Sequence, residues 1–195
     1  MKRRKFIKKI LLSFLGLLAI PNKLISKQVF QKSNFKDGIF LNNYLPYDQK
    51  SSKDFWKWRK ERKEIKIDPI SFPLAKNDLE FLRSNRTENT LTFIGHASFL
   101  IQINGLNILT DPHFTKRASP LSFAGPLRTT PPGIRLEDLP EIDVILISHN
   151  HYDHLDKGSI KGILKSQKIQ PVIFTPLKLN KLLEKWGAKN VKSMN

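Results

Sequence analysis

The feature that most constrains this chain is a β-branched apolar run with a cluster of histidines directly behind it. Residues 142–147 read Ile-Asp-Val-Ile-Leu-Ile, a pattern typical of a buried strand. His149, His151, Asp153 and His154 follow at once, and they include three of the five histidines in the chain. The sequence therefore predicts a core strand that ends at a turn rich in metal-binding side chains.

The residue types in this turn point to a metal site. Borderline cations such as Zn²⁺ take imidazole nitrogen and carboxylate oxygen as ligands. His149 and His151 project to the same side of an extended segment, and Asp153 and His154 follow where a helix is expected to begin. Two ligand pairs offset by a turn suit two adjacent metal ions, an arrangement used in hydrolysis. The alternative is a polar loop with surface histidines.

The motifs around the cluster resemble metallo-β-lactamase-fold hydrolases, whose signature is His-x-His-x-Asp-His after a hydrophobic strand. The flanking motifs are similar to the branch that contains the N-acylphosphatidylethanolamine-hydrolysing phospholipase D enzymes. These motifs are Thr92–Ser98, Leu109–Pro112, Arg117–Pro126 and Ile147–Asp156. The resemblance implies an α/β fold, the αββα sandwich, and a phosphodiesterase-type hydrolase with two Zn²⁺ ions per complete site.

The resemblance also assigns roles to the clustered residues. His149 and His151 match the ligands of one zinc, and Asp153 and His154 match those of the other. Asp153 is in addition a candidate proton acceptor in catalysis. The implied substrates are lipid-type phosphodiesters, although lactones and other esters stay open because the scaffold hosts many reactions.

The family draws further ligands from a C-terminal half, namely another His, a bridging Asp and a last His. No histidine follows His154 in this chain. We therefore expect the N-terminal half of the sandwich, a catalytically incomplete site and an isolated chain without activity. Such a half would expose apolar residues such as Ile145 and Ile147. The alternatives are a non-catalytic truncated remnant, or one half of a split enzyme that needs a complementing C-terminal half as partner.

Four further polar residues are candidates for the surroundings of the cluster. His96 either approaches the metal edge or is a core-edge histidine bonded to backbone. Asp111 either orients the metal loop, as the family likeness suggests, or is a plain turn residue before Pro112. Tyr152 could line the cleft, and His113 is expected to be exposed in a loop.

Composition narrows the classes of partner. The absence of cysteine excludes disulfides and thiolate metal sites,. The formal net charge of +17 permits attraction to anionic phospholipid or nucleic acid, but lysine is spread along the whole chain. No nucleic-acid partner is expected, because no recognisable binding module accompanies the charge. Only residues 57–66, beside Trp56 and Trp58, cluster enough to suggest a local anionic partner such as a membrane surface.

The chain divides into three segments. Residues 1–20 join a basic head to the apolar run 10–20, which as a helix spans only ~16 Å of a ~30 Å hydrocarbon core. With Arg3-Arg4 it resembles a twin-arginine export signal; the alternative is an ordinary basic signal in which the two arginines are adjacent by chance. We therefore expect an exported bacterial protein, periplasmic or anchored to the inner membrane. Residues 21–89 are expected to form a basic linker and lead-in segment, and residues 90–195 the N-terminal half of the sandwich domain.

Periodicity and turn residues predict the elements of the sandwich. Strands are expected at 90–94, 98–103, 106–110, 143–147, 171–175 and 190–193, and helices at 54–64, 78–83, 156–165 and 177–186. Asn104-Gly105 is a strong hairpin signal, and Asp156 is a suitable helix N-cap. The long loop 112–139 is expected to be functional. Strands that alternate with helices indicate an α/β layered unit.

Overall fold

A computed structural model describes residues 35–42, 50–65 and 73–194. The chain forms two compact units, 1–48 and 49–195. The segment expected to direct export, residues 1–20, lies outside the described residues. None of the helices within the described ranges combines the length and the apolar character needed to cross a membrane.

The lead-in segment is more ordered than the expected irregular linker. Strands β1 (Phe35–Lys36) and β2 (Ile39–Phe40) form an antiparallel hairpin. Asp37 and Gly38 have φ values of 52° and 84° at its turn, the conformation that Asp-Gly favours. Helix α2 (Ser52–Glu64) begins two residues before the predicted start, because Ser51 and Asp54 form a reciprocal capping box,.

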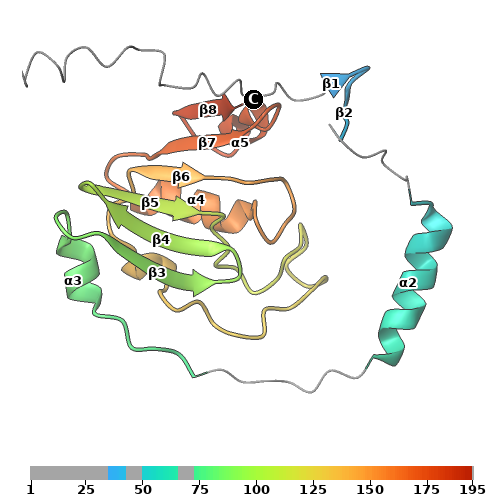
Figure 1. The fold of residues 1–195 in the computed structure, drawn as a ribbon, viewed down its shortest axis with the longest axis horizontal. Coiled ribbons are helices and arrows are strands. Elements are labelled where there is room, and N and C mark those ends of the chain that lie inside the picture. The colour runs from blue at the N-terminus through green and yellow to red at the C-terminus, as the bar shows by residue number, and fades with distance from the viewer. Residues whose placement is uncertain (1–34, 43–49, 66–72, 195) are drawn as a thin grey trace, which may run out of the picture. The chain divides into compact units, whose positions relative to one another are not determined.

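The main domain is built on one mixed sheet, which confirms the predicted α/β class (Figure 1). Its described strands are β3 (Thr90–Gly95), β4 (Ser98–Ile103), β5 (Leu106–Thr110), β6 (Val144–Leu146), β7 (Val172–Pro176) and β8 (Val191–Met194). They lie side by side in chain order. The pairs β3–β4 and β4–β5 are antiparallel, whereas β5–β6, β6–β7 and β7–β8 are parallel. The carboxyl ends of β5, β6 and β7 therefore meet at one edge of the sheet.

One face of the sheet carries the hydrophobic core. Leu100, Leu109, Ile145 and Ile173 are fully buried in neighbouring strands, and α4 packs behind the sheet in Figure 1. The helices of this domain are α3 (Leu79–Ser84), the 3₁₀ turn η2 (Leu136–Asp138), α4 (Lys157–Ser166) and α5 (Asn180–Lys185). Gly162 lets α4 approach η2, since a Cβ at this position would lie 2.8 Å from Leu136 Cδ1.

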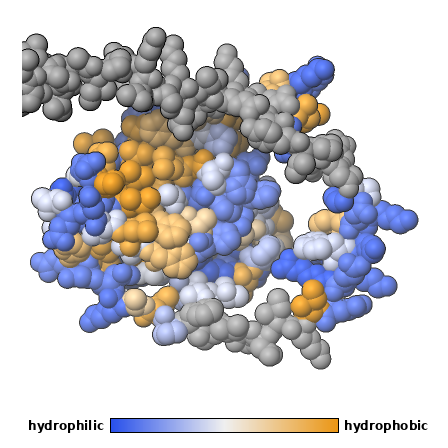
Figure 2. All heavy atoms as spheres, in the orientation of Figure 1, coloured by the Kyte–Doolittle hydropathy of each residue, from blue (hydrophilic) through white to orange (hydrophobic). Residues whose placement is uncertain are grey.

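The opposite face of the sheet is apolar and exposed. Leu91 and Phe93 of β3 are 67% and 59% exposed, and Met194 of β8 is 58% exposed. Figure 2 shows hydrophobic side chains gathered over the strands on this side. The expectation that Ile145 and Ile147 are exposed is wrong, because both side chains are buried in the helix-covered core. Side chains alternate along a strand, so Leu146, between them, is the one turned to the open face.

A buried amide network fastens α3 to the sheet. Gln102 of β4 is 2% exposed, and its Nε2 donates to the Leu82 carbonyl and to Asn107 Oδ1, both at 2.9 Å. Its Oε1 accepts from Asn85 Nδ2 and from Thr90 Oγ1. Each polar atom of the Gln102 amide thus has a partner, as burial requires.

Candidate metal centre

The loop after β6 gathers the four predicted ligands at the carboxyl edge of the sheet. A tight turn brings them together, because His151 O accepts from the backbone N–H groups of His154 and Leu155, at 3.0 and 2.7 Å. Leu155 then enters the core with 3% exposure. Asp156 caps α4, as predicted, by accepting from Gly158 N and Ser159 N. The loop is therefore anchored at both ends.

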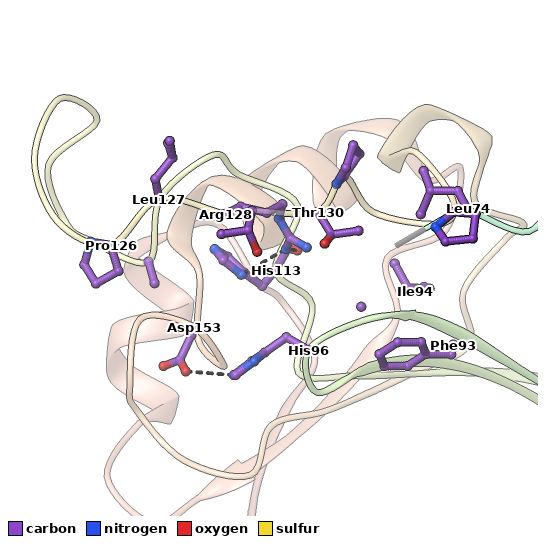
Figure 3. Close-up of a pocket in the computed structure, with 15 residues that line it drawn as sticks. Leu74, Phe93, Ile94, His96, His113, Pro126, Leu127, Arg128, Thr130 and Asp153 are labelled. Atoms are coloured by element: carbon purple, nitrogen blue, oxygen red, sulfur yellow. Dashed lines mark hydrogen bonds and ion pairs between the residues drawn. The ribbon is translucent and has the colours of Figure 1, made fainter. Parts of the chain in front are cut away.

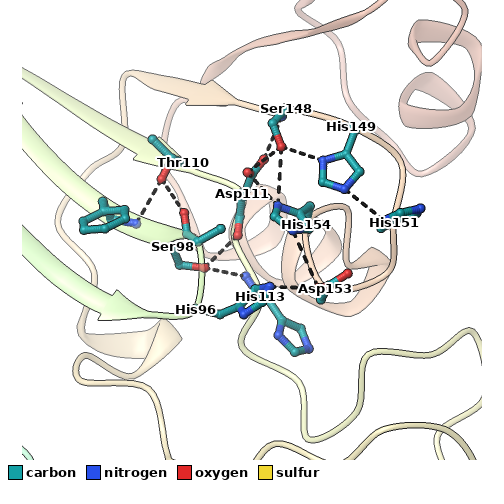
Figure 4. Close-up of polar contacts among 12 residues, drawn as sticks. His96, Ser98, Thr110, Asp111, His113, Ser148, His149, His151, Asp153 and His154 are labelled. Atoms are coloured by element: carbon teal, nitrogen blue, oxygen red, sulfur yellow. Dashed lines mark hydrogen bonds and ion pairs between the residues drawn. The ribbon is translucent and has the colours of Figure 1, made fainter. Parts of the chain in front are cut away.

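The imidazole rings of this loop face one another (Figure 4). His149 Nε2 lies 3.0 Å from His151 Nδ1, which fits the prediction that these two side chains share a side. The ring centroids of His149 and His154 are 4.0 Å apart. Asp153 Oδ2 lies 3.6 Å from His154 Nε2. The structure thus links all four residues by contacts, and their imidazole nitrogens and carboxylate oxygens are donors that fit Zn²⁺. Among the described residues, the group whose donor atoms could share one ion contains Asp153 and His154 but not His149 and His151.

Asp111, at the end of β5, holds the loop from inside. Its Oδ1 accepts from Ser148 N at 2.7 Å, and its Oδ2 accepts from Ser148 Oγ at 2.7 Å. Oδ2 also lies 2.9 Å from His154 Nδ1. A carboxylate is an acceptor only, so His154 Nδ1 donates to Asp111, and Nε2 is the ring nitrogen directed toward Asp153. This contact orients the ring in the way that supports a metal ligand.

His96 joins the cluster from the turn between β3 and β4. His96 Nε2 lies 2.8 Å from Asp153 Oδ2. Single donor atoms of His96, Asp153 and His154 all lie within 4.8 Å of one another, a grouping that could hold a metal ion. His96 has φ 55°, which is uncommon for a residue other than glycine and is often found at functional sites. The interpretation of His96 as a core-edge residue is not supported, because its side chain is exposed.

Electrostatics favour the ligating forms of two of these groups. Burial, helped by the nearby rings of His154 and His151, lowers the pKa of His149, and a neutral imidazole is the form that binds metal. For Asp153, burial alone would raise the pKa. The backbone hydrogen bond and the neighbouring His154 and His96 outweigh it, so the pKa of Asp153 is lowered.

His113 is buried, contrary to the expectation of an exposed loop histidine. It is 5% exposed and lines a cleft of about 550 Å³ together with His96 and Asp153. Arg128 Nη2 lies 3.0 Å from His113 Nδ1 and also donates to the His113 carbonyl. Burial, and then the charge of Arg128, lower the pKa of His113.

Two residues near the cluster, Arg128 and Ser148, are not predicted as site residues from the sequence. The position of Ser148 directly before His149 is a signal that could have identified it as a neighbour of the histidine cluster. No sequence pattern around Arg128 indicates a role, because it is the tertiary fold of the long loop that places this residue in the cleft. Tyr152 is 52% exposed and lines a different hollow, with His151 and Lys161, so the structure does not bring it into the cluster.

Comparison with known proteins identifies relatives of this domain. The family model described as Beta-lactamase superfamily domain matches residues 90–195. N-acyl-phosphatidylethanolamine-hydrolyzing phospholipase D 1 of Caenorhabditis elegans is 45% identical over 98 residues, 49% of this chain and 27% of that protein. An uncharacterized protein of Mycobacterium tuberculosis is 30% identical over 178 residues, 89% of this chain and 46% of its own length.

A metal-dependent hydrolase of Aeropyrum pernix is 32% identical over 83 residues, 42% of this chain and 29% of that protein. The chain thus spans less than half the length of these relatives. The family match covers just over half of the chain, and it includes β3 to β8 and every residue of the cluster. The chain therefore belongs to the beta-lactamase superfamily.

Proposed function

We propose that this chain is part of a zinc-dependent hydrolase that cleaves phosphodiesters of the lipid type. One observation carries the proposal: His149, His151, Asp153 and His154 converge at the carboxyl edge of parallel strands, with Asp111 and His96 bonded to members of the cluster. Ligand sites in open α/β sheets lie at this edge. The superfamily match and the metal-dependent relative support a metal.

Each residue of the cluster has a separate role in this proposal. His149 and His151 would hold one ion, and Asp153 and His154 would hold the other. When bound, the metal would supply an activated water and stabilise developing negative charge. Asp111 keeps the His154 proton on Nδ1, and Asp153 is placed to accept a proton beside His96. The nematode relative, whose name specifies phospholipase D activity, supports a phosphodiester substrate over a lactone or other ester.

We further propose that a complementing half covers the open face of the sheet and supplies the remaining metal donors. That face exposes Leu91, Phe93 and Met194 by more than half. An apolar surface of this kind marks an interaction site or a tendency to aggregate. Without such a half we expect metal binding but no turnover.

Helix α2 supports the proposal of an anionic membrane surface as partner. Trp56 and Trp58 are 63% and 49% exposed. Arg59 lies 5.6 Å from the Trp56 ring centroid, and Arg62 lies 5.2 Å from that of Trp58. Aromatic and cationic side chains on one exposed helix suit the headgroup region of a bilayer.

Zinc titration of the purified chain tests the metal site. The wild type should take up zinc, and His149→Ala with His151→Ala should abolish the uptake. Asn150→Ala is the matched control, because Asn150 is exposed between the two histidines and should leave zinc uptake unchanged. Equal zinc uptake by the wild type and the double variant would refute the proposed function.

Export is tested separately with a reporter fused to residues 1–35. Arg3→Lys with Arg4→Lys keeps the charge but removes the twin-arginine pair, so export should fail. A reporter exported at the full level after this change would contradict a twin-arginine address.

A further inference from the structure

Beside the proposed metal centre lies a cleft with two different walls (Figure 3). Its volume is about 550 Å³. One wall is apolar and includes Leu74, Phe93 and Ile94, whereas the other carries His113 and Arg128. His96 and Asp153 also line the cleft. A ligand seated there would therefore touch both the metal cluster and the Arg128 wall.

Arg128 forms no salt bridge in the described part of the chain, although the negative charge of Asp156 acts on its guanidinium. Arg83 lies 2.7 Å from Asp138, and Arg86 forms an ion pair with Asp143. Within the described residues Arg117 also lacks a salt bridge, but its guanidinium donates to the Gly125 carbonyl in an exposed hydrogen bond. No carboxylate of the described residues lies within 4.0 Å of the Arg128 guanidinium. The side chain is only partly exposed, and burial lowers its pKa, yet arginine stays charged in proteins. A partly desolvated, unpaired charge is costly unless an anion joins it.

The bonds that Arg128 makes leave one nitrogen for a ligand. Nη2 donates to the His113 carbonyl and approaches His113 Nδ1, and Nε donates to the Thr115 carbonyl at 3.4 Å. Nη1 has no hydrogen bond within the described residues. It lies next to Gly95, where a Cβ would come within 3.3 Å of it. Nη1 is therefore held against the backbone that leads into His96.

His113 adds a second unsatisfied donor. Its Nδ1 faces a guanidinium, which can only donate, so Nδ1 accepts and Nε2 carries the proton. Nε2 is buried and has no partner at normal hydrogen-bond geometry in the described structure, although the backbone of Arg117 lies close enough to raise the pKa of His113 in part, against the larger effect of burial. Buried polar atoms are nearly always paired. A donor without a partner at normal geometry, next to a cation without a salt bridge, favours an anionic acceptor in this part of the cleft.

We propose that Arg128, held in place by His113, is a specificity-determining residue that recognises the anionic group of an amphiphilic ligand, while the apolar wall receives its hydrocarbon part. The inference rests on the proposed function, because it assigns the cleft to the substrate of the same site. Phosphate monoesters and diesters fit this site, because one of their charged oxygens can accept a charge-assisted hydrogen bond from Nη1. Asp153, the carboxylate in this cleft, is already paired with His96 at 2.8 Å.

Equilibrium binding to the full 195-residue chain, freed of metal with a chelator, tests this assignment. The probes are decyl phosphate below its micelle concentration, decanol and inorganic phosphate. Decyl phosphate should bind more tightly than either of the others, because it alone engages both walls. Inorganic phosphate that binds as tightly as decyl phosphate, or decanol that does so, would overturn the proposal.

Arg128→Gln should weaken decyl phosphate binding by about tenfold or more, the loss of one charge-assisted hydrogen bond, and should leave decanol binding unchanged. Lys161→Gln is the matched control, because it removes the same charge from the neighbouring hollow and should leave both affinities unchanged. Equal losses in the two variants would show unspecific attraction and refute the assignment.

A second variant covers the case in which Arg128→Gln does not fold. Thr129 lines the cleft and is exposed, so Thr129→Glu places a negative charge there without touching the bonds of Arg128. It should weaken decyl phosphate binding by about tenfold or more and spare decanol. Undiminished binding of decyl phosphate to folded Thr129→Glu would overturn the inference. Because these measurements contain no metal, their outcome is independent of the zinc titration that tests the proposed function.

Discussion

Replacement of Asp111 by Asn should separate the fold of the metal loop from its ability to bind metal. The two side chains have nearly the same shape. Asp111 has φ 36°, a backbone conformation that Asn also tolerates, so the change adds little strain. Asn keeps one oxygen, which can still accept from Ser148 N. Its NH₂ group replaces Oδ2, the oxygen that now lies 2.7 Å from Ser148 Oγ and 2.9 Å from His154 Nδ1.

Two consequences follow from this exchange. The Ser148 hydroxyl can rotate to accept, so the variant loses mainly the charge-assisted part of the buried contacts, about 1–3 kcal/mol in the free energy of unfolding. His154 Nδ1 must now accept from the amide, which moves the ring proton to Nε2. The nitrogen that faces Asp153 is then no longer a free lone pair. We expect zinc affinity to fall by about 10- to 100-fold.

Urea unfolding of the metal-free protein measures the first effect, and competitive zinc titration measures the second. Asp111→Ala is the comparison variant, because it leaves all the donors around Oδ1 and Oδ2 unpaired and should cost more, about 3 kcal/mol or above. Zinc affinity of Asp111→Asn equal to that of the wild type would refute the proton-placement argument, even if stability falls as expected.

Three further outcomes test the fold. Gln102→Leu should lower the free energy of unfolding by about 2 kcal/mol or more, measured in urea, because the buried amides of Asn85 and Asn107 lose a partner,. The pKa of His113 is lowered in the folded state, so the unfolded chain binds the proton more tightly. Stability should therefore decline as pH falls below about 6.5, and less so in His113→Gln. Leu91→Lys on the open face should raise solubility at unchanged thermal stability, whereas Leu100→Lys in the core should destabilise by about 3 kcal/mol or more.

The sequence predicted the bounds of elements that depend on residues close together in the chain. The strand expected at 98–103 has the same bounds in the structure, because alternation and the Asn104-Gly105 turn define both ends. Both turn residues have positive φ, 51° and 75°. The helix expected at 177–186 is shorter and begins at Asn180. Lys178 has φ 72°, which no residue of a right-handed helix can adopt. Lysine has no preference for this conformation, so the sequence does not predict it.

The same contrast applies to the site. His149, His151, Asp153 and His154 were found because they are adjacent in sequence. The contact between His96 and Asp153 joins residues 57 positions apart, and periodicity carries no such information. His113 is buried because the loop after β5 docks on α4, where Phe114 N donates to Ser159 Oγ at 2.6 Å. Tertiary packing of this kind decides burial, and a histidine in a loop gives no sign of it.

In the proposed metal centre, two metal ligands are accessible to solvent, whereas the residue that positions the metal loop is buried. His149 and His151 are at least partly exposed, so their loss removes donors without opening the core. Asp111 is buried at 6% exposure and is bonded to the loop, so any change there alters stability and ligand orientation together. A variant with lower zinc affinity but an unchanged free energy of unfolding therefore identifies a metal ligand. A variant in which both quantities fall identifies a residue that positions the ligands. Comparison of a His149 variant with an Asp111 variant therefore distinguishes the loss of a metal donor from the loss of the residue that supports the donors.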